Sequence, residues 1–254
     1  MKFKIGYFYS EDLNLYGDNG NVEVLVQRCL ARGINVEVIE IGVRDLVTPN
    51  ETGDLNFVFM GGGPDSSQKS MYEDLLQNKR SYLEDYIESG GVGLFICGSY
   101  QLLGQYYKAA DGSILDGLGF VDFYTENFGL EKPRCIGNIV CEINPELRHD
   151  PIFNANNKIG SDLVGFENHG GRTYLGSTVS PFGKVLSGSG NNGEDNTEGI
   201  LYKNIIGTYL HGPLLSKNPH IADYLIAKSL KIDHLINIDD DLINTAHTAL
   251  KALK

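Results

Sequence analysis

Hydrophobic residues in the first hundred positions form two kinds of pattern, one typical of strands and one typical of helices, which follow one another along the chain. Short apolar runs predict strands at residues 3–9, 56–60 and 92–97, and an alternating pattern predicts another strand at residues 34–41. Apolar positions spaced three or four residues apart predict amphipathic helices at residues 22–32 and 72–89. This alternation of strands and helices favours a mainly parallel central sheet with helices on both of its faces.

After residue 107 the pattern changes to short strand-like pieces separated by glycine-rich turns. They occupy residues 118–124, 137–143, 163–166, 173–176, 185–187 and 199–210. We expect added antiparallel strands here, with residues 205–210 returning to the central sheet. Two amphipathic stretches, 221–230 and 235–253, predict C-terminal helices. The prediction is an α/β protein with one domain over residues 1–232 and a C-terminal helical tail over residues 233–254.

Composition narrows the class of protein. The 254 residues carry a formal net charge of -12, which argues against a nucleic-acid surface because phosphate binding needs a basic footprint. No apolar run approaches the roughly 18 residues that span a membrane, and the first residues lack a signal-peptide pattern. The four cysteines fit neither a zinc ribbon nor a disulfide scaffold. We therefore expect a cytoplasmic protein with reduced thiols and no metal site.

One of those cysteines, Cys97, stands where a strand runs directly into a helix. The apolar run 92–96 stops at Cys97, Gly98 and Ser99 follow, and Gln101 begins a helical pattern. This spacing is typical of a nucleophile elbow, in which a tight turn exposes the side chain at the carboxyl end of the sheet. A helix N-terminus also favours the thiolate form of a cysteine. The alternative is an inert cysteine at the end of a core strand.

Two further stretches predict partners for Cys97. Gly61, Gly62 and Gly63 follow the strand at 56–60, and an N–H group from Gly62 or Gly63 could join that of Gly98 in an oxyanion hole. A plain glycine turn is the alternative for these residues. His211 ends another apolar strand and could act as the general base for the Cys97 thiol.

These motifs resemble the class I glutamine amidotransferases, and most of all the glutaminase domains of cobyric acid synthases. The stretches that carry the resemblance are Gly61-Gly62-Gly63, Cys97-Gly98-Ser99-Tyr100-Gln101 and Gly207-Thr208-Tyr209-Leu210-His211-Gly212. Residues 12–21 and 165–170 further resemble the glutaminase subunits of lipid II isoglutaminyl synthases. The resemblance covers roughly residues 3–230.

The resemblance implies a flavodoxin-like fold and a glutaminase reaction. Cys97 would attack the side-chain amide of L-glutamine, and His211 would protonate the departing ammonia. Gln101 matches a position that helps to hold the substrate. Arg134 is our candidate for binding the glutamine carboxylate, because a guanidinium fork suits that group, although it could be an ordinary surface arginine. Residues 167–169 could line the pocket or form a polar turn.

The family also implies a partner. The chain lacks a Gly-Lys-Ser/Thr phosphate-binding signature, so we expect no cofactor in it, and ATP in a Mur-ligase-like subunit, MurT, that forms a heterodimer with it. That subunit would bind lipid II as the acceptor and amidate its D-glutamate to D-isoglutamine. Other interpretations are an amidotransferase for another acceptor, a cysteine peptidase or hydrolase of similar fold, and a binding module with an inert cysteine.

One position departs from the class pattern. Many class I members carry a glutamate two residues after the histidine, but this chain has Pro213 there. The sequence therefore predicts either a Cys97–His211 dyad or an acid supplied by the partner subunit.

Overall fold

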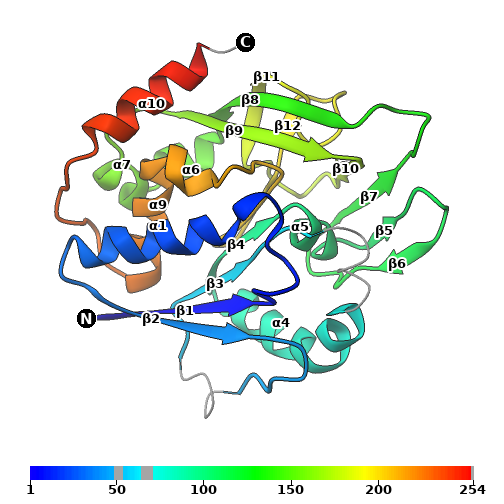
Figure 1. Ribbon diagram of the computed structural model, residues 1–254, viewed down its shortest axis with the longest axis horizontal. Helices are drawn as coiled ribbons and strands as arrows, with labels where there is room; N and C mark the ends of the chain where they lie inside the picture. Colours follow the sequence, from blue (N-terminus) through cyan, green and yellow to red (C-terminus); the bar gives the residue numbers. More distant parts are fainter. Residues whose placement is uncertain (49–53, 64–70, 253–254) are drawn as a thin grey trace.

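The computed structural model describes residues 1–48, 54–63 and 71–252, and its centre is a six-stranded sheet (Figure 1). All neighbouring strands are parallel except for the edge pair β13 and β14, which is antiparallel. In order across the sheet, the strands are β13 (Ile200–Tyr202), β14 (Ile205–Thr208), β4 (Val92–Ile96), β3 (Phe57–Met60), β1 (Lys2–Phe8) and β2 (Asn35–Ile41). This confirms the predicted α/β fold with a mainly parallel sheet.

Helices cover both faces of this sheet. Helices α1 (Asn19–Leu30) and α9 (Pro219–Leu230) pack on one face, and α4 (Arg80–Glu88) lies on the other (Figure 1). Every residue of β3 and β4 is buried as a result. Burial on two faces explains why these strands read as continuous apolar runs rather than alternating ones.

The predicted helix at residues 72–89 contains one irregular turn. Residues 71–88 are helical, with a π-helical segment, Leu75–Lys79, before α4. Lys79 is fully buried there. Its Nζ lies 2.8 Å from an Asp74 carboxylate oxygen and donates a hydrogen bond of 2.6 Å to the Asp45 carbonyl oxygen. A buried ammonium group needs such partners.

The second half of the chain adds strands, as predicted, and they form two four-stranded sheets that are antiparallel except for one parallel pair. One consists of β10 (Gly171–Leu175), β7 (Phe123–Asn127), β5 (Tyr106–Lys108) and β6 (Ile114–Asp116). The other consists of β12 (Thr197–Glu198), β11 (Gly183–Ser187), β8 (Cys135–Ile143) and β9 (Asp162–His169). The short helices α6 (Pro145–His149) and α7 (Pro151–Asn156) join β8 to β9.

Several predicted elements have different bounds. The stretch predicted at residues 199–210 contains two strands, β13 and β14, which pair in antiparallel fashion. The strand predicted at residues 118–124 begins only at Phe123, because the Leu118 N–H donates to the Leu102 carbonyl at the end of helix α5 (Gly98–Leu102). The helix predicted at residues 235–253 is α10, Asp241–Lys251, and residue 253 lies outside the described residues. The segment before α10 is held in a non-helical form by tertiary bonds.

Those bonds centre on a buried arginine. Arg28 of α1 is 4% exposed and pairs with Asp223 and Asp240, each at 2.7 Å. The Leu235 N–H donates to the Asn156 side chain at 2.8 Å. The segment leads into α10, which packs on β9 and on α8 (Leu214–Lys217). Breaking one member of such a buried ion network costs about 3–5 kcal/mol, so the Arg28–Asp240 pair is a strong link between α1 and the residue before α10.

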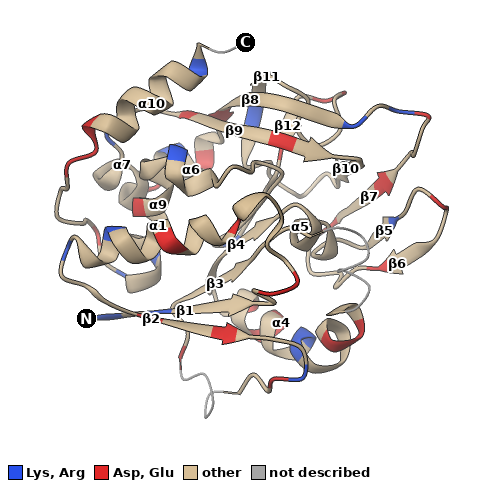
Figure 2. Ribbon diagram, in the orientation of Figure 1, with Lys and Arg blue, Asp and Glu red and all other residues tan. Residues whose placement is uncertain are grey.

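Charged residues are distributed over many elements, with no broad basic stripe on the ribbon (Figure 2). Within the described ranges, none of the helices has the length and apolar character needed to cross a bilayer.

Two buried histidines make the stability of this fold pH-dependent. Burial, followed by the nearby His247, lowers the pKa of His220 to about 3, and burial also lowers the pKa of His247. Unfolded histidine titrates near about 6.5, so the unfolded chain takes up these protons first as the pH falls. We predict that the free energy of unfolding falls below about pH 6.5 by up to about 1.4 kcal/mol per pH unit because of His220, and that His247 acts in the same direction.

The measurement is urea unfolding between about pH 6.5 and 4.5, a range in which His220 takes up its proton mainly in the unfolded chain. The variant His220→Gln should show a shallower pH slope, and the exposed His149→Gln should keep the slope of the unmodified protein. Equal slopes in the His220→Gln variant and the unmodified protein would show that His220 does not contribute.

Candidate active site

Cys97 stands on a strained turn between β4 and α5 (Gly98–Leu102). Its φ of 52° and ψ of -106° lie outside the regions that residues with a side chain favour. The Cys97 N–H donates to the Thr208 carbonyl at 2.8 Å, and the Ser99 hydroxyl donates to the Met60 carbonyl at 2.7 Å. Neighbouring strands therefore hold the elbow in place from both sides.

His211 reaches the same place from the segment after β14. Its backbone bonds to Phe166 of β9 in both directions, at 2.8 Å and 3.3 Å, and its side chain is fully buried. A Cβ added at Gly62 would lie 3.1 Å from Cys97 Cβ and 3.1 Å from His211 Cε1. The two predicted residues thus meet over Gly62, where any side chain would crowd both.

Asp18, which lies in the stretch 12–21 that carries the family resemblance but was given no role there, completes the cluster. Its Oδ1 lies 3.1 Å from His211 Nδ1, its Oδ2 accepts the Gly62 N–H at 2.9 Å, and the residue is fully buried. Asp18 lies just before α1, in the loop that follows β1. The absence of an acid at Pro213 therefore leaves no gap, because this chain itself places a carboxylate beside His211.

The place of Asp18 in the sequence, soon after the first predicted strand, could have indicated that its carboxylate lies near Cys97. The ends of parallel strands meet at one edge of a sheet, so an acid in the loop after β1 is a candidate neighbour of the elbow after β4. The glycine and asparagine residues around Asp18 indicate a turn, and that pattern alone assigns no chemistry to the carboxylate.

The Asp18 carboxylate and Cys97 favour the protonated form of His211. Burial opposes the charged imidazole, but the hydrogen bond to Asp18 and the nearness of Cys97 outweigh it and raise the pKa of His211 to about 10. His211 Nε2 makes no well-formed hydrogen bond to any described residue, so it is the nitrogen left to serve the thiol and the substrate.

The predicted oxyanion donors differ in their availability. The Gly62 N–H is directed at Asp18, so the prediction that it could serve the substrate does not fit this arrangement. Gly98 is the first residue of α5, directly after the nucleophile, and Gly63 directly follows Gly62. Gly98 and Gly63 are therefore the remaining candidate donors. Gly61 must be a glycine, since a Cβ there would approach the Leu13 carbonyl oxygen to 2.1 Å.

The two predicted substrate-binding residues lie in different surroundings. Gln101 is buried, one turn beyond Cys97, and its Nε2 donates to the Tyr209 hydroxyl at 3.1 Å. Arg134 is exposed, and its guanidinium donates to Asn168 at 3.0–3.2 Å. The Asn168 amide donates to the Tyr16 hydroxyl at 2.7 Å, and the Tyr16 ring lies 4.9 Å from that of His211. Arg134 is thus linked to the rim of the site.

The sequence left open whether residues 167–169 line the pocket or form a polar turn. The structure excludes the turn, because these residues end strand β9, where Glu167 and His169 are buried. Both Glu167 oxygens accept backbone N–H groups, from Ser189 at 2.7 Å and Gly190 at 2.9 Å. The His169 ring stacks on Tyr209 with centroids 3.7 Å apart. His169 therefore packs directly against Tyr209, the residue that accepts a hydrogen bond from Gln101.

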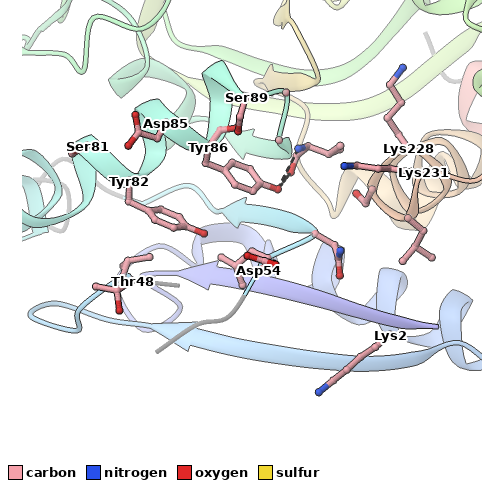
Figure 3. Close-up of a pocket in the computed structure, with 18 of the residues that line it drawn as sticks. Lys2, Thr48, Asp54, Ser81, Tyr82, Asp85, Tyr86, Ser89, Lys228 and Lys231 are labelled. Atoms are coloured by element: carbon pink, nitrogen blue, oxygen red, sulfur yellow. Dashed lines mark hydrogen bonds between the residues drawn. The ribbon is translucent and has the colours of Figure 1, made fainter. Parts of the chain in front are cut away.

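The structure also has a cavity of about 960 Å³ at the opposite, amino-terminal edge of the sheet. Residues at the starts of β1, β3 and β4 line it, and Tyr82 and Tyr86 of α4 extend into it (Figure 3). Neither Cys97 nor His211 is among its lining residues. Because the elbow is at the carboxyl ends of the strands, this cavity is separate from the candidate active site.

Comparisons with known proteins agree with the site. The model of the CobB/CobQ-like glutamine amidotransferase domain matches residues 4–219. A lipid II isoglutaminyl synthase subunit GatD from Staphylococcus aureus is 44% identical over 225 residues, which cover 89% of this chain and 83% of that protein. A GatD from Streptococcus pneumoniae is 38% identical over 230 residues, which cover 91% of this chain and 81% of that protein.

More distant relatives share less of their length or only the fold. A probable cobyric acid synthase from Methanococcus maripaludis is 34% identical over 166 residues, which cover 62% of this chain and 30% of that protein. The structure of PurLQS from Thermotoga maritima has a TM-score of 0.59 at 13% identity and covers 91% of this chain and 99% of that chain. The chain therefore belongs to the CobB/CobQ-like glutamine amidotransferase family and, within it, to the group that includes the GatD subunits.

Proposed function

We propose that this chain is the glutaminase subunit of a lipid II isoglutaminyl synthase, which releases ammonia from L-glutamine for a Mur-ligase-like partner. The observation that carries this proposal is the buried cluster of Cys97, His211 and Asp18 around Gly62. The GatD relatives carry the name of that synthase and match over most of their length.

The cluster supports a two-step reaction. The Cys97 thiolate attacks the amide carbon of the glutamine side chain, and the N–H groups of Gly98 and Gly63 stabilise the oxyanion that forms. His211 Nε2 gives its proton to the nitrogen, the carbon–nitrogen bond breaks, and ammonia leaves a γ-glutamyl thioester on Cys97. Neutral His211 then takes a proton from water, which attacks the thioester and releases glutamate and the thiolate.

Asp18 has a positioning role in this scheme. Its contact with Nδ1 fixes the His211 tautomer so that Nε2 faces the reaction, and its negative charge stabilises the imidazolium. Gln101 and Arg134 are proposed to hold the substrate, Gln101 beside the nucleophile and Arg134 at the rim through the glutamine carboxylate.

The acceptor chemistry is proposed for the partner. A MurT-type subunit would use ATP to activate the α-carboxyl group of the D-glutamate in the lipid II stem peptide, and ammonia would convert it to D-isoglutamine. In this scheme the chain needs no cofactor of its own, acts in the cytoplasm, and forms a heterodimer with that subunit in peptidoglycan synthesis.

Replacing the nucleophile tests the glutaminase step. Cys97→Ser should lower glutamine hydrolysis by the complex at least about a thousandfold, because no thioester can form. Cys29→Ser, at a buried cysteine on α1, should keep the activity. The measurement is ammonia release from glutamine, and substantial activity in Cys97→Ser would contradict the proposal.

Replacing Asp18 tests the triad. Asp18→Asn should lower kcat by about 10²–10⁴-fold and lower the pKa of His211 from about 10, because burial would then act without the opposing carboxylate. Histidine NMR titration and the pH–rate profile measure both effects, and the loss of rate at high pH should begin at a lower pH. Asp12→Asn, in the same loop, is the matched control, and an unmoved His211 pKa in Asp18→Asn would refute this role.

Isotope transfer tests the acceptor. With the MurT-type partner, ATP and a lipid II analogue, the amide ¹⁵N of glutamine should appear in D-isoglutamine by mass spectrometry. The Cys97→Ser complex should transfer label from ammonium but none from glutamine, since only the glutaminase half is removed. A complex that hydrolyses glutamine, yet amidates lipid II from neither source, would contradict this acceptor.

A further inference from the structure

Three buried side chains of types that bind metal ions lie together on the sheet formed by β8 and β9. They are Cys135 of β8 and Glu167 and His169 of β9, and Cys135 is paired directly across from His169. Their possible ligand atoms all lie within 4.8 Å of one another. Thiolate, imidazole and carboxylate are the donors that bind Zn²⁺ in proteins.

The His169 side chain has the geometry of a metal ligand, with Nε2 as the nitrogen that would bind the ion. Its Nδ1 bonds to the Gly171 carbonyl oxygen at 2.7 Å, which places the proton on Nδ1 and leaves a lone pair on Nε2. Nε2 is buried and has no hydrogen-bond partner among the residues that the structure describes, and the side chain is 1% exposed. A buried, unpaired imidazole nitrogen is costly unless something binds it.

The spacing of the donors suits one ion. His169 Nε2 lies 3.7 Å from Glu167 Oε2. Two ligands that each lie about 2.1 Å from a tetrahedral Zn²⁺ are about 3.4 Å apart, so a shift of a few tenths of an ångström would bring both into contact with it. The 3.7 Å separation itself is too long for a hydrogen bond between the two side chains.

The surroundings provide the outer contacts that metal ligands have. The His169 Nδ1–H bond to a carbonyl is the usual partner of a ligating imidazole, and both Glu167 oxygens accept backbone N–H groups. Arg172 contacts the Cys135 sulfur and the Pro133 carbonyl. The Arg172 guanidinium thus also helps to fix the Cys135 sulfur beside Glu167 and His169.

We propose that Cys135, Glu167 and His169 form a Zn²⁺ site, in addition to the glutaminase centre and in place of the metal-free chain expected from the sequence. The ion would join β8 to β9 and fix His169 in the tautomer that its bond to the Gly171 carbonyl requires. The His169 ring stacks on Tyr209, which accepts a hydrogen bond from Gln101. By fixing His169, the ion would therefore also help to keep Tyr209 and Gln101 in place beside the candidate active site.

The test measures Zn²⁺ binding by the full chain in the Cys97→Ser background, so that the catalytic thiol cannot bind the metal. After chelator treatment, equilibrium dialysis should give one Zn²⁺ per chain, and Zn²⁺ should raise the melting temperature. Cys135→Ser and His169→Gln should each weaken binding at least about tenfold. Cys29→Ser, with a buried thiol on α1, should bind as the parent does.

A second measurement is independent of the ligand variants. With Cys29, Cys97 and Cys141 replaced, Cys135 is the sole thiol, and added Co²⁺ should give a thiolate-to-metal charge-transfer band that Zn²⁺ abolishes. Absence of that band, together with no Zn²⁺ retained in dialysis, would overturn the proposal. Binding that persists undiminished in folded Cys135→Ser and His169→Gln variants would overturn it as well.

Discussion

The buried carboxylate of Asp18 is the interaction on which the active-site geometry depends. One oxygen faces His211 Nδ1 and the other accepts the Gly62 N–H. A buried carboxylate is costly unless it is paired and hydrogen-bonded, and these two partners provide both forms of compensation. Because a single side chain holds both, the direction of the imidazole and the course of the glycine loop are coupled, and moving either one would disturb the other.

The topology of the sheet explains how distant residues reach this carboxylate. The parallel strands β1, β3, β4 and β14 are neighbours, and each ends at the same edge. Asp18 follows β1, Gly62 follows β3, Cys97 follows β4 and His211 follows β14. Sites of this kind form outside the carboxyl ends of parallel strands, where the crossover connections separate. The fold thus brings together four groups that lie far apart in the sequence.

The parallel sheet and Cys97 could be predicted from the sequence because local patterns define them. Features that depend on contacts between distant parts of the chain could not. Cys97 is recognisable because an elbow requires an apolar run, a nucleophile and a glycine in immediate succession. Asp18 has no such local signature, since a stretch of irregular loop separates it from the end of β1. The segment 235–240 shows helical periodicity but is fixed by the Arg28–Asp240 pair across 212 positions of sequence. Tertiary bonds of that range leave no mark on local patterns.

The central claim is that Asp18 and His211 act as one unit with Cys97. A double-mutant cycle on kcat/KM for glutamine hydrolysis, with Asp18→Asn, His211→Gln and both together, measures this most directly. If Asp18 works through His211, the double variant should be no slower than His211→Gln alone. If instead the two losses multiply, Asp18 contributes independently of the imidazole, and the three residues do not form a catalytic unit.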